Sequence, residues 1–435
     1  MRADGTGRGS RETDPARALT RIADIAADVL QPLPREGTLA GQEDVALRYG
    51  VHRTFVSTAV RRAVRENLLS VRIQRLPIVK RDAALEEELL RRFPRLSVTR
   101  VVEEGPAPEA AQDPQQDEYD LHARVGTAMS SAIAEENLIH TGAVCLVGSG
   151  RAVAHTALAL GQRSEPLKSR RVKLLSLSGG YPLMTVCSSR AIGIDADTCT
   201  RALAQAFSED VEVHTMTFPI MAPTSSTMKL FREMSWIGMA NRGGKEGRQP
   251  APEIALLGVG GPYPHNDPRF GFMEKHHWEG SAAFKSLQSL LELRATIKDR
   301  DCVLLADIAN HFVAVREDER FLANRHKQAF TDALQRLNRG LLTLPVSQLE
   351  SLDEILLVAA DRSGLKGKAI YQFLDDARRT APDRGVARGG RRRPREHPPR
   401  LPIKVLCVNR AIAQRVVDLD KERASRAESA HRPRG

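Results

Sequence analysis

The hydrophobic positions of residues 42–67 predict two short helices joined by a sharp turn. Apolar residues recur at helical spacing before Gly50 and again from Val56 to Ala63, and glycine favours the left-handed conformation that such a turn needs. The small residue Ala46, the glycine four positions later and the β-branched Val56 six positions after that match the spacing of a helix-turn-helix. An ordinary amphipathic helical hairpin is the alternative interpretation.

The opposite face of the second helix is polar and basic, which is typical of a helix that enters the major groove of DNA. A helical pattern over residues 16–30 precedes it, and an alternating, β-rich pattern over residues 68–79 follows it as a wing would. We therefore predict a winged helix-turn-helix domain at residues 17–80. The residues best placed to reach bases are His52, Arg53, Thr54, Ser57 and Thr58, and those best placed to contact phosphates are Arg61, Arg62 and Arg65.

From residue 97 onward, short apolar runs alternate with helical patterns, which predicts an α/β fold with a large parallel sheet covered on both faces. A helix over residues 83–93 precedes this region, residues 104–118 are expected to be a loop, and a helix is expected over residues 121–136. The tail from Lys421 is polar and is expected to fray. The predicted strands cover residues 101–102, 142–147, 172–177, 211–216, 253–257, 302–306, 354–359 and 403–408.

The positive charge is concentrated in two short segments. Residues 47–80 hold eight Lys and Arg against one acid, and residues 384–400 hold seven Arg against one Glu. Since the whole chain carries +11, the remaining residues sum to −2. The first segment coincides with the predicted helix-turn-helix, so the basic character marks a local nucleic-acid contact and not the whole surface.

No segment has the composition of a secretory signal or the roughly 18 consecutive apolar residues of a membrane helix. The chain has five cysteines and no Cys-x-x-Cys pair. Cys145, Cys302 and Cys407 lie in apolar, strand-like runs, where we expect small buried side chains in a reducing compartment. These features predict a cytoplasmic protein without a membrane partner.

Ligands of open α/β folds bind at the carboxyl ends of the strands, where helix N-termini present N–H groups to anions. Several predicted strand ends are rich in glycine or polar residues, although each such cluster alone is also typical of an ordinary tight turn. Together they predict a ligand pocket. Its candidate residues are Gly148, Ser149, Gly150, Arg151, Ser178, Gly179, Gly180, Gly258, Gly260, Asp307, Lys366 and Lys368.

Other patterns give no catalytic, metal or cofactor site. Adjacent His276 and His277 point in different directions from one backbone, and Ser149 has no His or Asp partner at recognisable spacing. The segment from Gly148 to Arg151 lacks the third glycine of a dinucleotide fingerprint. We expect residues 384–400 to form a solvated, disordered insert, with a nucleic-acid arm as the minority interpretation.

These parts, in this order, resemble the SorC family of bacterial sugar-binding transcriptional regulators, also described as DeoR-like. The resemblance covers roughly residues 19–420. The matching motifs are Gln42-Glu43-Asp44-Val45-Ala46, Gly50-Val51, Val56-Ser57, Ala63, Val147-Gly148-Ser149-Gly150-Arg151, Leu177-Ser178-Gly179-Gly180, Pro219 to Pro223, Leu257-Gly258-Val259-Gly260, Asp307-Ile308, the Lys366 and Lys368 stretch and Val405-Leu406-Cys407-Val408-Asn409.

The resemblance implies a NagB/RpiA-like, Rossmann-type effector domain that binds a sugar phosphate or related metabolite and controls operator binding by a homodimer or homotetramer. The chain departs from the family pattern at the expected ligand end, at Ala309-Asn310-His311, Ala360-Asp361-Arg362 and Asn409-Arg410. The expected organisation is a disordered N-terminus (1–16), the DNA-binding domain (17–80), a linker helix (83–96), an effector and oligomerisation domain (97–420) and a tail (421–435).

We therefore expect a non-enzymatic transcriptional regulator that binds a double-stranded DNA operator and a sugar phosphate. The alternative is a sugar-phosphate isomerase or deaminase-like enzyme with an N-terminal DNA-binding appendage. Turnover of a sugar phosphate would favour the enzyme, and tight binding with operator release would favour the regulator. A third interpretation is an RNA-binding protein led by residues 384–400, which predicts that deletion of this segment abolishes nucleic-acid binding.

Overall fold

The structure is a computed structural model, and the chain divides into two compact units, Met1–Leu76 and Pro77–Gly435. Each unit is described by itself. The described residues are 42–52, 55–56, 58–59, 79–104, 114–163, 165–179, 195–207, 210–216, 218, 220, 224–235, 252–263, 285–286, 288–290, 292–293, 304–308, 311–315, 324–344, 346–376 and 400–430.

The first unit contains the predicted turn between two helical segments. Helix α2 (Gln42–Tyr49) ends at Gly50, whose φ of +61° lies in the left-handed region, and the Val51 amide donates to the Ala46 carbonyl at 2.9 Å. Ala46, Val56 and Ala59 are buried. The glycine turn is therefore confirmed, and those residues of the two apolar faces whose burial is described are buried. The expected first helix (16–30) and the wing (68–79) lie almost entirely outside the described residues.

The second unit is built on a parallel sheet whose strands run in the order β1-β9-β8-β5-β2-β3-β4. Near-continuous apolar runs such as Glu354–Ala359 form these strands because both faces of a parallel sheet are covered. The predicted fold class is therefore confirmed. The strands are β1 (Val98–Val102), β2 (Val144–Val147), β3 (Val172–Ser176), β4 (Val211–His214), β5 (Ile254–Tyr263), β8 (Glu354–Ala359) and β9 (Ile403–Asn409).

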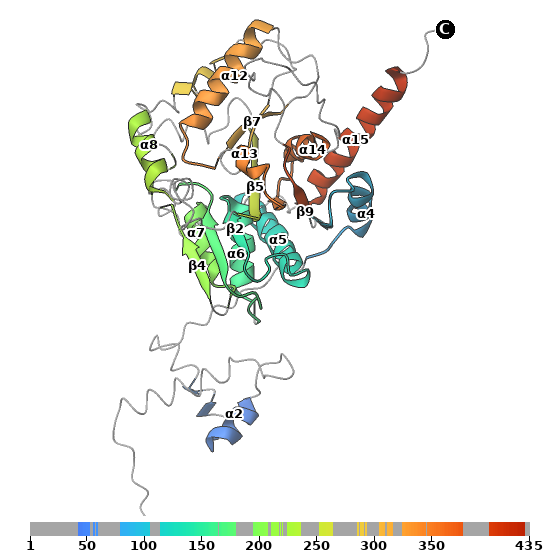
Figure 1. Ribbon diagram of the computed structural model, residues 1–435. Helices are drawn as coiled ribbons and strands as arrows, with labels where there is room; N and C mark the ends of the chain where they lie inside the picture. The colour runs from blue at the N-terminus through green and yellow to red at the C-terminus, as the bar shows by residue number, and fades with distance from the viewer. Residues whose placement is uncertain are drawn as a thin grey trace, which may run out of the picture. The chain divides into compact units, whose positions relative to one another are not determined.

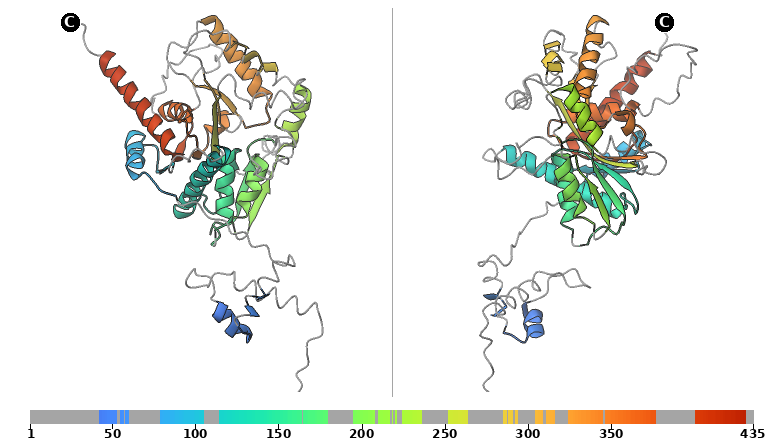
Figure 2. Two further views of the ribbon diagram at one scale, coloured as in Figure 1. Left: turned by 180° about the vertical axis from the view of Figure 1, so that it is seen from behind. Right: turned by 60° about the vertical axis from the view of Figure 1, so that its left-hand side comes forward.

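Helices cover both faces of the sheet, and Figure 2 shows them as layers on opposite sides. Successive strand residues point to opposite faces, so Val101 packs into one apolar core and Val102 into the other. The Val102 core contains α5 (Pro114–Glu135), α6 (Arg151–Gly161) and α7 (Ala196–Ala204), and the Val101 core contains α4 (Ala83–Arg92), α14 (Lys366–Asp376) and α15 (Arg410–Ala430) (Figure 1).

The glycine run after the predicted strand 253–257 is not a strand-to-helix turn. Strand β5 continues through Gly258–Gly261 and pairs there with the antiparallel hairpin of β6 (Leu304–Ile308) and β7 (His311–Val315). The expectation that these glycines end a strand was wrong, and so was the placement of Asp307 beyond one. Gly258 still pairs with Val358 in the parallel sheet, whereas Gly260 faces Asp307 in the antiparallel ribbon.

Two helix boundaries also differ from expectation. Helix α5 begins at Pro114, within the segment expected to be a loop, because proline is well suited to the first helical turn. Helix α15 continues through Lys421 to Ala430, where we expected fraying. Its exposed half is rich in helix-forming Ala, Glu and Arg, and Arg423 contacts Asp375 of α14.

The predicted helix after residue 83 is α4, and it does more than link two regions. Leu89 and Phe93 are buried in the core of the second unit, and Asp82 caps the helix through the Leu85 amide. The remaining described helices are α8 (Ser225–Met234), α12 (Asn324–Arg339) and α13 (Val346–Leu349). Among the described residues, no helix is long and apolar enough to span a membrane.

The described cysteines behave as the sequence predicts. Cys145 and Cys407 are buried, and neither forms a disulfide. Burial raises the pKa of the Cys145 thiol to about 12, so this thiol stays protonated. Cys302 and all of residues 384–400 except Arg400 lie outside the described part of the chain.

Candidate functional site

The strand order reverses between β2 and β5, which places a topological switch at their carboxyl ends. From β2 the chain proceeds through α6 to β3 and β4, whereas β5 leads to β8 on its other side. The Gly148 amide donates to the Leu256 carbonyl at 2.9 Å, so the two strand ends lie side by side. In open parallel sheets this crevice is where ligands bind.

Glycine at this crevice allows a close approach of two backbones. A Cβ atom on Gly258 would lie 3.1 Å from the Ser149 carbonyl oxygen, and one on Gly148 would lie 3.3 Å from the Leu256 carbonyl oxygen. Neither neighbour is a flexible side-chain end that moves aside easily. The structure thus brings Gly148, Ser149 and Gly258 together, as the sequence interpretation required of a shared site.

Helix α6 begins at this crevice with Gly150, whose φ of +115° is open to glycine but strained for other residues. Within the described part of the chain, no side chain caps this helix end. Arg151 follows, and its guanidinium pairs with Glu118 of α5 at 2.9 Å while both side chains are 52% exposed. Such exposed pairs contribute roughly 0–1 kcal/mol, so an anionic ligand can replace Glu118 at small cost.

Two buried histidines that sequence reasoning missed lie beside Arg151. Burial, together with the positive charge of nearby Lys366, lowers the pKa of His122 to about 3. Burial also lowers the pKa of His155 to about 4, with Arg151 as the second cause. Both imidazoles are therefore neutral at pH 7, and the positive charges of Lys366 and Arg151 both disfavour protonation of His122.

Hydrogen bonding and packing hold these histidines in place. The His122 Nδ1 atom lies 2.8 Å from the Glu118 carbonyl oxygen, and Tyr119 packs edge-on against His155 with ring centroids 4.7 Å apart. As a donor through Nδ1, neutral His122 presents Nε2 as an acceptor. Isolated histidines on helical faces give no recognisable spacing, which is why the sequence did not indicate them.

The N-terminus of α14 differs from that of α6 because the chain supplies its own anion. The Asp361 carboxylate accepts hydrogen bonds from the Lys366 amide and the Ser363 amide, both at 3.0 Å, and Lys366 Nζ donates to the Ala360 carbonyl at 3.0 Å. A phosphate at this helix end would meet a carboxylate already in place. Lys368 lies one residue beyond Gly367 in the first turn of α14.

Asp361 belongs to a polar network that sequence reasoning also missed. Buried Asn409 accepts from the Asp361 amide at 2.9 Å and donates to Glu104 at 2.6 Å, and Arg362 contacts Asp117. Its residues come from positions 104–117, 361–362 and 409, which are far apart in sequence. The segments at Asp361 and Asn409 depart from the family pattern, and this departure was the one sequence signal that could have pointed to the network.

The structure does not place the remaining ligand candidates at the crevice between β2 and β5. Ser178 is buried and bridges Thr343, while the Gly179 amide donates to the Leu342 carbonyl at 3.0 Å. The end of β3 is therefore covered by the chain after α12. Gly260 and Asp307 lie in the β5–β6 ribbon, and Gly180 lies outside the described residues.

Only part of the candidate DNA-reading face is described. His52 and Thr58 are exposed, consistent with a surface that contacts a partner. Arg53, Thr54, Ser57, Arg61, Arg62 and Arg65 lie outside the described residues, as do His276, His277 and Trp278. Within the described ranges, no group of three or more His, Cys, Asp or Glu side chains is arranged to hold a metal ion.

Neither a family model nor a curated protein matches the chain. Among solved structures, it is similar to the full-length sorbitol operon regulator SorC from Klebsiella pneumoniae, with 17% identity over 93% of this chain and 100% of that chain and a TM-score of 0.47. A transcriptional regulator from Streptococcus pneumoniae matches with 13% identity, coverage of 78% and 97%, and a TM-score of 0.48.

A third similar structure is an enzyme, the 6-phosphogluconolactonase from Plasmodium vivax, with 11% identity, coverage of 78% and 99%, and a TM-score of 0.33.

Proposed function

We propose that this protein is a DNA-binding transcriptional regulator whose operator binding is controlled by a sugar phosphate or related carbohydrate metabolite. The observation that carries the DNA-binding half is the turn at Gly50, where a left-handed glycine joins α2 to a helical segment whose Val56 and Ala59 are buried. The turn lies within the basic segment of residues 47–80.

The effector half is supported by the edge where β2 and β5 end. Among the described residues, an exposed ion pair with Glu118 holds Arg151 there, and the neutral imidazoles of His122 and His155 lie beside it. A guanidinium suits a phosphate, since its fork of donors matches phosphate oxygens, and neutral imidazole suits a sugar hydroxyl as a hydrogen-bond partner. We place the effector at this edge, against α6.

DNA recognition is tested with duplexes selected from a random pool by the full-length protein. Arg53→Ala should cost roughly 1–3 kcal/mol at one base position, whereas Arg62→Ala should weaken all sequences and lower the salt slope by about 1. Arg91→Ala is the matched control, because it removes the same charge from an exposed position on α4. Unchanged affinity and base preference in Arg53→Ala would show that this helix does not read DNA.

Effector binding is tested by thermal shift with glucose 6-phosphate, fructose 6-phosphate and ribose 5-phosphate, with the free sugars and inorganic phosphate as comparisons. A ligand at a hundred times its Kd should stabilise the protein by about 2.7 kcal/mol. The same samples are assayed for isomerisation, lactone hydrolysis and ammonia release. Turnover of any of these compounds would support the enzyme interpretation instead.

We further propose that the regulator acts as a homodimer or homotetramer. One recognition helix reads a short half-site, and two-fold related copies would read two half-sites about 34–36 Å apart, or a multiple of this distance. Light scattering of the full-length protein, free and bound to a selected duplex, measures the number of copies. A monomer on DNA would contradict this arrangement.

A further inference from the structure

The chain enters the second unit along the edge strand of its sheet. Lys80, Arg81 and Asp82 run antiparallel to the end of β1, with the Asp82 amide donating to the Val101 carbonyl at 2.8 Å and the Glu103 amide donating to the Lys80 carbonyl at 2.9 Å. We call residues 80–82 the linker strand, because the segment preceding them leads to the first unit. Two backbone hydrogen bonds are few, so a short strand of this kind opens easily unless side chains hold it.

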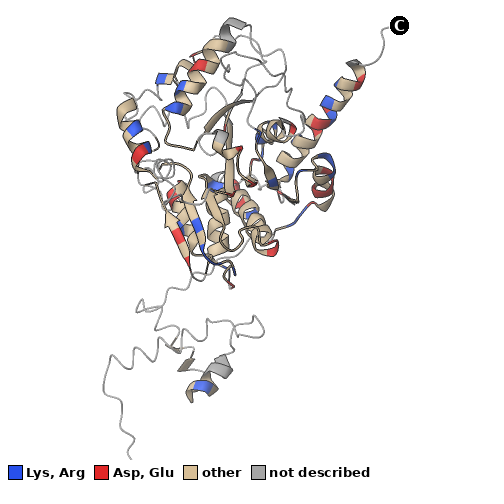
Figure 3. Ribbon diagram, viewed as in Figure 1, with Lys and Arg blue, Asp and Glu red and all other residues tan. Residues whose placement is uncertain are grey.

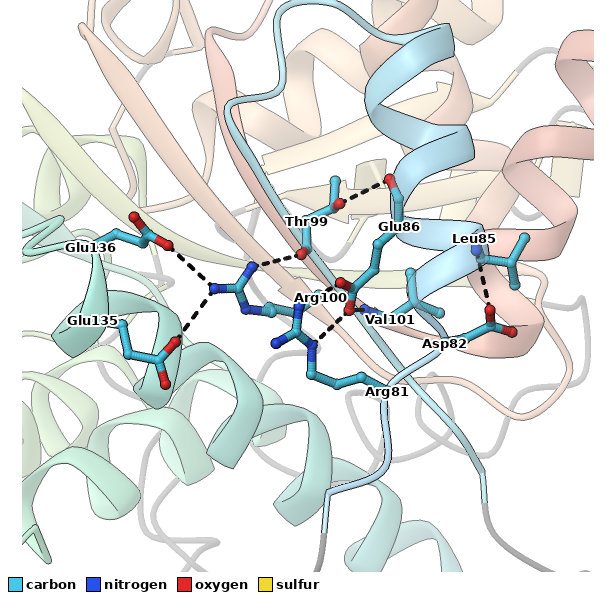
Figure 4. Close-up of polar contacts among 9 residues, drawn as sticks. All are labelled: Arg81, Asp82, Leu85, Glu86, Thr99, Arg100, Val101, Glu135 and Glu136. Carbon is cyan, nitrogen blue, oxygen red and sulfur yellow. Dashed lines mark hydrogen bonds and ion pairs between the residues drawn. The ribbon is translucent and has the colours of Figure 1, made fainter.

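The buried carboxylate of Glu86 holds the linker strand in place, as Figure 4 shows. Arg81 donates to both oxygens of Glu86, through Nε at 2.9 Å and through Nη2 at 2.5 Å. Glu86 is only 7% exposed, and its Oε1 atom also accepts the Val101 amide of β1 at 2.9 Å. One carboxylate thus joins the linker strand to the edge of the sheet, and the bidentate geometry fixes the position of Arg81.

The same edge strand leads directly into the network at the candidate ligand end. Glu104 follows the segment that pairs with the linker strand, and its Oε1 atom accepts from Asn409 Nδ2 at 2.6 Å and from the Ala411 amide at 2.8 Å. Asn409 is bonded in turn to both backbone groups of Asp361, whose carboxylate caps α14 at Lys366. Arg124 of α5 donates to the Glu104 carbonyl at 2.7 Å.

We propose that Glu104 is a coupling residue that connects the carboxyl ends of β8 and β9 to the linker strand. A change in the position of α14 or β9 is transmitted through Asn409 to Glu104, and through the adjacent Glu103 amide to Lys80. The functional consequence, which rests on the proposed function, is that effector binding alters how firmly residues 80–82 are held. Both ends of this connection are polar contacts that have discrete made and broken states.

The connection is tested without any ligand by amide hydrogen exchange of the full-length protein. Glu104→Gln should speed exchange at the Asp82 and Glu103 amides by about tenfold, as loss of a charge-assisted hydrogen bond would. Arg100→Gln is the matched control, since Arg100 lies on β1 but pairs with Glu135 and Glu136 at 3.4 Å and 3.3 Å. Unchanged exchange of the linker strand in Glu104→Gln would overturn the proposal.

A reciprocal variant covers the case in which Glu104→Gln does not fold. Arg81→Lys keeps the charge but loses the bidentate contact with Glu86, and coupling requires that it speed exchange at the Asp361 and Ala411 amides. The β2 amides report the integrity of the fold and should stay protected. Faster exchange confined to residues 80–86 would mean that the contact between Arg81 and Glu86 stabilises this segment alone. The proposal would then be wrong.

Sugar phosphates then separate the coupling from the proposed function. If glucose 6-phosphate, fructose 6-phosphate or ribose 5-phosphate stabilises the protein, exchange of the linker strand should change in the wild type, while Glu104→Gln should keep the thermal shift and lose this response. The same response in both proteins would contradict coupling through Glu104. If no sugar phosphate shifts the thermal transition, the proposed effector class is wrong. The exchange measurements without ligand still test the coupling through Glu104.

Discussion

The two helix N-termini at the ligand edge of the sheet are built in opposite ways. Helix α6 begins at Gly150 with no side-chain cap, and the nearby Arg151 is held by an exposed carboxylate from another helix. Helix α14 is capped by Asp361, which is itself fixed by Asn409. Because helix N-termini attract anions, we propose that α6 accepts an external anion, whereas the Asp361 carboxylate already occupies this position at α14.

The largest expected difference concerns the glycines before these helices. Both Gly364, with φ of +67°, and Gly150 are in the left-handed range. A Cβ on Gly364 would lie 2.8 Å from the Ala411 carbonyl oxygen, whereas one on Gly150 would have no described neighbour within 4 Å. Gly364→Ala should cost about 3 kcal/mol in free energy of unfolding and Gly150→Ala about 1–2 kcal/mol. Urea denaturation measures both, and equal losses would show that the close approach at Gly364 is unimportant.

The next effect is on ligand affinity. Arg151→Ala should weaken binding of a stabilising sugar phosphate by about 10–100-fold with little change in stability, because the lost pair with Glu118 is exposed. Lys366→Ala should weaken binding less, since Lys366 Nζ donates to the Ala360 carbonyl. Isothermal titration calorimetry gives the two Kd values. A larger loss in Lys366→Ala would place the anion at α14.

Removal of the internal anion should have a smaller effect. Asp361→Ala eliminates the cap of α14, which typically costs about 1 kcal/mol, and leaves the backbone contacts with Asn409 in place. The same variant should allow inorganic phosphate to stabilise the protein more than it stabilises the wild type. Unchanged stability measured by urea denaturation would contradict the capping role.

The smallest expected effect is on the pH dependence of stability, which distinguishes the N-terminus of α6 from that of α14. His155 is neutral in the folded state because burial and Arg151 lower its pKa to about 4, whereas an unfolded histidine titrates near 6.5. Stability is therefore fully present above pH 6.5 and declines as pH falls towards 4, where the folded state also binds the proton. Arg151→Ala raises the folded pKa, so it should lose less stability than the wild type between pH 6.5 and 4.

Lys366→Ala is the matching control, because Lys366 acts on His122. Histidine-selective NMR titration should show the pKa of His155 rising in Arg151→Ala but not in Lys366→Ala, and the pKa of His122 rising more in Lys366→Ala than in Arg151→Ala. A rise in the pKa of His155 in Lys366→Ala would mean that the N-termini of α6 and α14 are not electrostatically distinct.

The sequence predicted those features that depend on local patterns. Apolar runs identified β8 and β9, and the offsets of Ala46, Gly50 and Val56 identified the turn of the first unit. The continuation of β5 through Gly258–Gly261 was not predictable in this way, because glycine after an apolar run is equally typical of a turn. Pairing with the distant β6 hairpin determines which conformation forms there.

The polar network escaped prediction for a related reason. Glu104, Asp361 and Asn409 come from separate strand ends, and their contacts exist only once β1, β9 and β8 are adjacent. Glu86 likewise looked like an ordinary charged residue of a helix face, yet it is buried against β1. Figure 3 shows acidic and basic residues interspersed over the described part of the second unit, so charge alone did not mark these positions.

We propose that a small molecule at the edge of the sheet controls DNA binding by the same chain. The most direct test of this claim is the Kd of the full-length protein for a selected DNA duplex, measured with and without a stabilising sugar phosphate. The proposed coupling predicts a change of about 5–150-fold in the wild type and almost none in Arg151→Ala. An identical Kd with and without saturating ligand in the wild type would contradict the claim.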